Sequence, residues 1–95
     1  MNQGGDYYWQ ELLEVFLNQK NKDDMELFLQ TILTLSEKTE FVNRYRIIKE
    51  LLESTKTQRE IASDLKVSIA NVTRGSNLLK SSKINLSRIF NIKRK

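Results

Sequence analysis

Side chains that can contact nucleobases are concentrated between residues 69 and 74. Threonine and asparagine can hydrogen-bond to base edges in the major groove of DNA, and an alanine methyl can touch the methyl group of thymine. Two flanking cations, Arg59 and Lys80, are placed to neutralise phosphates. The residues expected to lie where base edges are met are Ile69, Ala70, Asn71, Thr73 and Arg74.

A helix that begins at residue 57 is the first element needed to position these groups. Thr57 and Glu60 have the spacing of a capping box, in which each side chain bonds to the backbone N–H of the other residue. Ala62 leaves room for a second helix to cross, as a helix-turn-helix requires. The apolar residues expected on the buried side are Ile61 and Leu65.

The turn and the second helix follow in residues 66–80. We expect Val67 to be buried in the turn and Ser68 to cap the second helix. Val72 then faces inward, together with Ile69 and Leu79. The opposite side of this helix would carry the base-contacting groups, as in helix-turn-helix proteins that bind the major groove.

The rest of the chain is also predicted to be helical, because it has no proline, only three glycines and apolar residues at helical spacing. Asp23 or Asp24 is expected to cap a second helix, and Thr34 with Glu37 a third that ends near residue 54. The apolar positions of these helices and of a short last one are Trp9, Leu12, Leu13, Phe16 and Leu17; Met25, Phe28, Leu29, Ile32 and Leu33; Phe41, Tyr45, Ile48, Leu51 and Leu52; and Ile84, Leu86, Ile89, Phe90 and Ile92.

Charge is distributed unevenly along the chain. Residues 1–64 contain 8 basic and 12 acidic side chains, whereas residues 65–95 contain 8 basic and none acidic. The net charge is therefore −4 in the first part and +8 in the second. This asymmetry indicates that the C-terminal part meets a polyanion. The alternative is a solvated basic tail.

Composition disfavours several classes of protein. Because the chain has no cysteine and no histidine, it lacks thiolate and imidazole metal ligands and the commonest general base. It has no glycine-rich phosphate loop, no secretory signal and no apolar run near the roughly 20 residues of a membrane span. We expect a cytoplasmic protein that is not an enzyme, with no catalytic residue, no bound metal and no membrane partner.

A second copy of the chain is the expected partner of the first two helices. They are rich in large apolar groups, and a domain of 95 residues has little interior in which to bury them. Intrachain packing is the alternative. A homodimer would also supply two DNA-contacting heads.

The chain resembles the bacterial tryptophan repressor family. The likeness is carried by TILTLSE at residues 31–37, NRYRIIKELL at 43–52, TQREIASDL at 57–65 and above all ANVTRGSNLLK at 70–80. It implies an all-α fold of six helices in an intertwined homodimer. Residues 1–95 would form one domain, with dimerisation helices in 1–56, the helix-turn-helix in 57–80, and a short helix and basic tail in 81–95.

The resemblance also implies a corepressor, free L-tryptophan, bound between the dimer core and each head. Arg44 and Arg74 match the two arginines that sandwich the indole ring and hold the carboxylate. Gly75 matches the glycine that lets the ligand approach. Thr31, Leu33 and Thr34 match the segment of the other subunit that receives the ligand. On the DNA side, Ile69, Ala70, Asn71 and Thr73 match base-facing positions, and Gln58, Arg59, Ser76, Asn77 and Lys80 match backbone-contacting ones.

The sequence departs from the family pattern at the ligand and in the turn. Leu78 stands where the family has a serine that helps to hold the ligand amine, so a des-amino indole acid is expected to bind comparatively well. The turn reads Lys66-Val67-Ser68, where the family has glycine on both sides of the middle residue. This change predicts a head that is better ordered without ligand. Asn71 replaces a threonine and Ala62 a lysine.

The sequence thus predicts a repressor of tryptophan-metabolism genes that binds operator DNA when L-tryptophan is present. Two alternatives remain open. One is a related regulator that binds DNA without responding to tryptophan. The other is a protein- or RNA-binding adaptor whose basic tail meets RNA.

Overall fold

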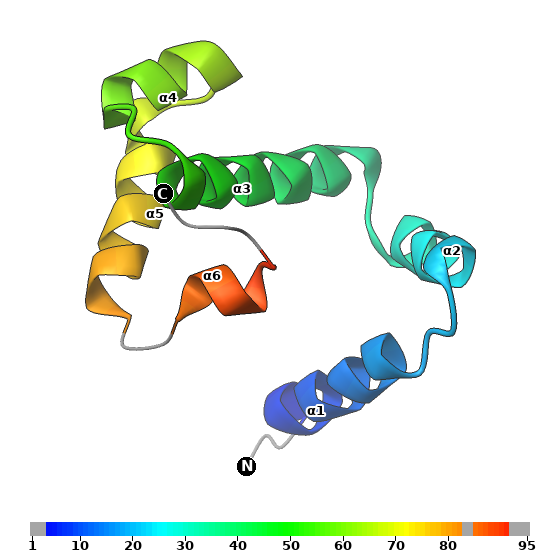
Figure 1. The fold of residues 1–95 in the computed structure, drawn as a ribbon. Helices are drawn as coiled ribbons and strands as arrows, with labels where there is room; N and C mark the ends of the chain where they lie inside the picture. Colours follow the sequence, from blue (N-terminus) through cyan, green and yellow to red (C-terminus); the bar gives the residue numbers. More distant parts are fainter. Residues whose placement is uncertain (1–3, 83–84, 92–95) are drawn as a thin grey trace. The chain divides into compact units, whose positions relative to one another are not determined.

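The computed structural model describes residues 4–82 and 85–91, and its regular elements are all α-helices (Figure 1). This confirms the predicted all-α class. The chain divides into two compact units, one up to Ser36 and one from Glu37 onwards. No helix in the described part of the chain combines the length and apolar content of a membrane span. The helices are α1 (Gly4–Leu17), α2 (Lys22–Ile32), α3 (Leu35–Glu53), α4 (Gln58–Leu65), α5 (Ile69–Ser81) and α6 (Leu86–Ile89).

The first unit is a corner between α1 and α2. Phe16 and Phe28 meet edge to face across it, with ring centroids 5.2 Å apart. The predicted cap of α2 was wrong: Asn21, not Asp23 or Asp24, accepts the Asp24 N–H at 2.8 Å. The amide oxygen of Asn21 is three residues upstream, whereas both aspartates already lie in the first turn, where their charge favours the helix dipole.

The apolar stripes of the first unit are not covered within it. None of the described residues 5–36 is buried. Trp9 is 55% exposed and Leu17 78% exposed, and both belong to the predicted apolar stripe of α1. Leu12, Phe16, Met25, Phe28 and Leu29 are half-buried at the corner.

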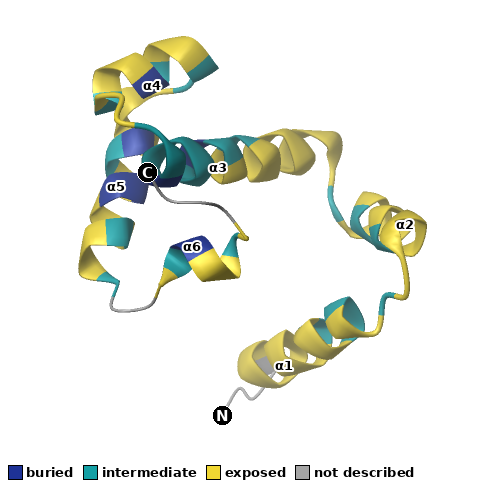
Figure 2. Ribbon diagram, in the orientation of Figure 1, coloured by how far each residue is buried: buried dark blue, intermediate teal, exposed yellow. Residues whose placement is uncertain are grey.

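The core of the second unit lies where α3, α4 and α5 meet (Figure 2). Ile61 and Val72 are fully buried there, as predicted, and Ala62, Leu65 and Val67 pack against them. Ile47 is also buried but was not predicted, because the stripe through Ile48 and Leu52 accounted for the apolar face of α3 without it.

The ends of these helices depart from the predicted inward faces. Ile69 is 48% exposed, because it is the first residue of α5 and lies before Val72, the residue of this helix that enters the core. Phe41 and Tyr45 are exposed on the N-terminal half of α3. Tyr45 stacks on Phe90, with centroids 6.2 Å apart, which brings the end of α6 against α3. The predicted apolar positions Ile84 and Ile92 lie outside the described residues.

Both predicted caps of the helix pair are confirmed. Thr57 and Glu60 form a reciprocal capping box, with hydrogen bonds of 2.8 and 3.1 Å. The Ser68 hydroxyl accepts the Asn71 N–H at 3.1 Å and opens α5. These bonds satisfy helix N–H groups that have no partner within the helix.

The turn between α4 and α5 requires a strained backbone conformation at Lys66. The Val67 N–H bonds to the Ala62 carbonyl, and the Lys66 N–H to that of Ser63, which is a Schellman motif. Lys66 must therefore adopt the left-handed conformation, with φ 58° and ψ 46°. This conformation disfavours residues with a Cβ by about 1–2 kcal/mol. The stabilisation that the cap at Ser68 provides is thus offset by backbone strain at Lys66.

Lys56, in the loop between α3 and α4, links the end of α4 to the end of α3. The Lys56 ammonium lies 2.9 Å from an Asp64 carboxylate oxygen and 3.6 Å from one of Glu50. The hydrogen bond to Asp64, and the charges of Asp64 and Glu50, raise the pKa of Lys56. Because the folded pKa is raised, this contribution to stability is present at neutral pH and is lost only as the pH rises through that raised value.

Truncating Ile61 tests the core. Ile61→Ala should lower the free energy of unfolding by about 2–5 kcal/mol, because a fully buried side chain leaves a cavity. The matched change Ile69→Ala, at an exposed position, should alter it by less than about 0.5 kcal/mol. Urea denaturation at one fixed protein concentration measures both, and equal losses would contradict the assigned core.

Glycine at position 66 tests the strain in the turn. Lys66→Gly should raise the free energy of unfolding by about 1 kcal/mol, because glycine adopts the left-handed conformation without a steric penalty. The same replacement inside a helix, Lys38→Gly in α3, should lower it by about 1 kcal/mol. The two variants should therefore shift the urea midpoint in opposite directions; a loss in both would show that Lys66 is unstrained.

Candidate functional site

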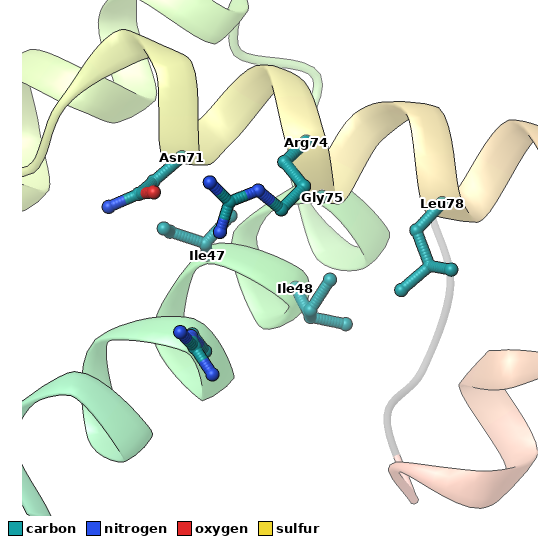
Figure 3. A pocket seen from close by; sticks show the side chains of 7 residues that line it. Ile47, Ile48, Asn71, Arg74, Gly75 and Leu78 are labelled. Carbon is teal, nitrogen blue, oxygen red and sulfur yellow. The ribbon is translucent and has the colours of Figure 1, made fainter. Parts of the chain in front are cut away.

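A hollow of about 140 Å³ lies between α3 and α5, and we call it the arginine hollow (Figure 3). Within each helix its lining positions are mostly three or four residues apart, so they form one stripe that faces the other helix. The lining residues are Arg44, Ile47 and Ile48 from α3, and Asn71, Arg74, Gly75 and Leu78 from α5.

At Gly75 the backbone of α5 lies close to the side chains of α3. A Cβ placed there would lie 3.2 Å from Ile47 Cγ2, 3.3 Å from Leu51 Cδ1 and 3.4 Å from Ile48 Cδ1. Contacts below 3.4 Å are tighter than ordinary van der Waals packing. The missing side chain therefore lets α5 rest directly on the isoleucines that form the floor of the arginine hollow.

Two guanidinium groups give the arginine hollow its charge. Arg44 comes from α3 and Arg74 from α5, and both are exposed. Glu40 lies 4.0 Å from Arg44, but both side chains are about two-thirds exposed, so this pair is weak. Arg74 has no ion pair with any residue in the described ranges. Among the residues that the structure describes, no acidic side chain lines the arginine hollow, which therefore favours an anion.

The apolar surfaces of the arginine hollow are provided by isoleucines and a leucine. Ile47 and Ile48 project from α3 towards α5, and the Leu78 side chain extends from α5 one turn beyond Gly75 (Figure 3). Leu78 offers no hydrogen-bonding group. A flat apolar body that carries an anionic group matches this combination of apolar floor and guanidinium groups.

Sequence reasoning placed four of these residues in a ligand site and missed three. Arg44, Arg74, Gly75 and Leu78, all predicted to hold a ligand, line the same hollow. Asn71 lines it too, although it was assigned only to the DNA-facing surface. Its spacing of three from Arg74 and four from Gly75 was a signal for this. The other two that were missed are Ile47 and Ile48.

The remaining predicted ligand residues lie in the first unit. The Thr31 hydroxyl donates to the Leu27 carbonyl at 2.7 Å near the end of α2. Leu33 follows α2, and its N–H bonds to the Leu29 carbonyl at 2.8 Å. Thr34 directly precedes α3. These three residues were predicted to act on the ligand of the other subunit.

Most residues predicted to contact DNA are exposed on α4 and α5. Ser76 is buried instead: it is 7% exposed and lines a separate hollow between α3, α5 and α6. Gln58 and Thr73 are half-buried, and the Thr73 hydroxyl donates to Gln58 Oε1 at 2.8 Å. The exposed residues are Arg59, Ile69, Ala70, Asn71, Asn77 and Lys80.

The fold and the site define a class of protein. Two helices joined by a three-residue turn, the second with one open side, are typical of DNA-binding regulators. The arginine hollow lies between α3 and the second helix. A small anion bound there would affect the orientation of that helix.

Comparison with known proteins identifies the family. Residues 7–93 match the model of the Trp repressor protein family. A Trp operon repressor homolog of Xylella fastidiosa (strain M23) is 42% identical over 73 residues, covering 77% of this chain and 79% of that protein. One of Chlamydia trachomatis serovar D is 48% identical over 71 residues, covering 70% and 76%. One of Vibrio cholerae serotype O1 is 38% identical over 73 residues, covering 77% and 71%.

The chain belongs to the Trp repressor family. This confirms the resemblance carried by residues 31–80. The family consists of DNA-binding regulators of transcription rather than enzymes, so the protein is a transcriptional repressor.

A side chain at Gly75 should disturb both the packing and the arginine hollow. Gly75→Val should lower the free energy of unfolding by about 1–3 kcal/mol, because the added methyl groups overpack the contact with Ile47 and Leu51. Gly5→Val is the matched control, since nothing lies within 4 Å of a Cβ at that position. Its effect should stay within about 0.5 kcal/mol in the same urea titration. Similar effects at the two sites would mean that α5 does not rest on α3 through Gly75.

Proposed function

We propose that this protein represses genes of tryptophan metabolism by binding operator DNA as a homodimer when L-tryptophan occupies the arginine hollow. The observation that carries the proposal is that Arg44 and Arg74, from two different helices, line one hollow with an apolar floor. A guanidinium stacks on an aromatic face, with a gain of roughly 0.5–2 kcal/mol, and also pairs with a carboxylate. An aromatic amino acid offers both partners.

Electrostatics supports a ligand between the arginines. Two guanidinium groups that line one hollow repel each other, and no carboxylate among the lining residues compensates them. A carboxylate-bearing ligand would relieve this repulsion. It would also link α3 to α5.

The dimer is supported by the apolar surface that one chain leaves open. Tyr7, Trp9 and Leu17 are exposed on α1, and Leu27 on α2. In the second unit a broader hollow of about 550 Å³, next to the arginine hollow, is walled by exposed apolar groups of α3 and by Phe90. Burying each large apolar side chain gains about 1.5–3 kcal/mol. The exposed apolar positions of α3 that line it are Phe41, Val42 and Tyr45.

A second subunit would also complete the ligand site. The arginine hollow, at about 140 Å³, is smaller than the roughly 300–1,000 Å³ of most ligand pockets. We propose that Thr31, Leu33 and Thr34 of the other subunit close it over the bound tryptophan.

The mechanism follows from the position of the arginine hollow behind α5. A ligand held by Arg44 and Arg74 fixes the angle of α5 to α3, and thereby the direction in which Ile69 and Ala70 point. In helix-turn-helix dimers, the Trp repressor among them, two such helices meet major grooves about 34–36 Å apart. Ligand that favours this spacing must bind more tightly when DNA is present. Such a repressor acts in the compartment that holds the operator, in a bacterium the cytoplasm.

Arg74 variants test the ligand. With Arg74→Ala, added L-tryptophan should no longer raise operator affinity in a gel-shift titration. Arg74→Lys keeps the charge for any phosphate contact but lacks the planar group, so it too should lose the response. Arg88→Ala in α6 removes one exposed positive charge away from the arginine hollow and should retain it.

If the operator affinity of Arg74→Ala still rises with added tryptophan, the assignment of the ligand site is wrong. Isothermal titration of the wild-type dimer with L-tryptophan separates this proposal from a regulator that ignores tryptophan. Loss of duplex sequence preference, with a steep salt dependence retained, would instead indicate the adaptor that binds RNA.

A further inference from the structure

The hydrogen bond between Gln58 and Thr73 joins α4 and α5, the two helices of the head that is proposed to contact DNA. Thr73 Oγ1 donates to Gln58 Oε1 at 2.8 Å, and the two residues are 15 positions apart in the chain. Gln58 is the first residue of α4, and Thr73 lies one turn after the exposed Ile69 on α5. We propose that Gln58 fixes the polarity of Thr73, so that Thr73 meets the operator only as a hydrogen-bond acceptor. This inference rests on the proposed binding of DNA.

Counting donors and acceptors gives the consequence for base recognition. A threonine hydroxyl has one proton and two lone pairs. Because the proton of Thr73 is directed to Gln58, only its lone pairs are left for DNA. In the major groove the base donors are the amino groups of adenine and cytosine, whereas guanine and thymine present acceptors. Thr73 should therefore select adenine or cytosine over guanine or thymine on the strand that it meets.

Gln58 keeps a second function in this arrangement. Its carbonyl oxygen holds Thr73, and its two amide N–H groups are free to donate to a phosphate oxygen. One side chain thereby couples a backbone contact to a base preference. The neighbouring residues Ile69 and Ala70 have no side-chain hydrogen-bonding group, so they cannot supply this preference.

Asn71, unlike Thr73, can both donate and accept hydrogen bonds towards DNA. Its amide has both donors and an acceptor, and it also lines the arginine hollow. Nothing in its position fixes one polarity towards DNA. Thr73 is therefore the residue of α5 whose base preference depends on a partner in α4.

Selection from a pool of random duplexes, at saturating L-tryptophan, tests the inference. Wild-type protein should enrich one operator sequence. Thr73→Val identifies the base pair that Thr73 reads, because preference falls there alone, and Thr73→Ser should restore it. At that base pair the wild type should lose roughly three- to tenfold in affinity, the range for one hydrogen bond, when the adenine or cytosine is replaced by an analogue that lacks the amino group.

Two Gln58 variants separate orientation from phosphate contact. Gln58→Met removes the acceptor, so Thr73 can rotate its proton towards DNA and the preference should fall to less than about twofold. Gln58→Glu keeps an oxygen that accepts from Thr73 but turns a negative charge towards phosphates. It should bind every sequence more weakly while retaining the wild-type preference. Circular dichroism of each variant should show unchanged helix content.

Three results would overturn the inference: an unchanged affinity when the amino group at the Thr73 base pair is removed, an unchanged preference in Gln58→Met, or no position affected by Thr73→Val. A failure of the proposed function has a different signature, since wild-type protein would then enrich no sequence at all, with or without tryptophan.

Discussion

The contact of α5 with α3 at Gly75 is the constraint on which the site depends. Because position 75 has no side chain, the helix axis comes close enough for Val72 to enter the core beside Ile47 and Ile61. The arginine hollow lies between the same two helices and has Gly75 among its lining residues. A larger residue at 75 would separate the helices and fill the same space. The packing of α5 on α3 and the proposed access of a ligand therefore both depend on the absence of a side chain at Gly75.

Polar groups near the surface fix the joints of the head around its small apolar core. The capping box of Thr57 and Glu60, the cap at Ser68, the bond of Thr73 to Gln58 and the clamp of Lys56 on Asp64 each fix one joint. Such bonds contribute modestly, and exposed ion pairs weaken with salt. A small apolar core with polar joints suits an element whose angle a ligand is proposed to set. Strain at Lys66 works against that rigidity.

The first unit has a different role, because its apolar residues are not matched by an interior. Trp9 and Leu17 follow a clear helical stripe, yet both stay exposed in the single chain. The stripe predicted helices correctly, but a periodic pattern does not specify whether the same chain or another covers the face. A second copy is the proposed cover, and it would bring Thr31 and Thr34 to the arginine hollow of its partner.

The sequence by itself determined the local elements and the kind of chemistry. Spacing alone was enough for the capping box at Thr57 and for Ser68, because a cap involves residues three apart. It also identified the inward faces through Ile61 and Val72. Only the tertiary structure decided which side chains meet across helices. Ile47 in the core and Thr73 on Gln58 depend on the angle at which α5 crosses its neighbours, and no local spacing encodes that angle.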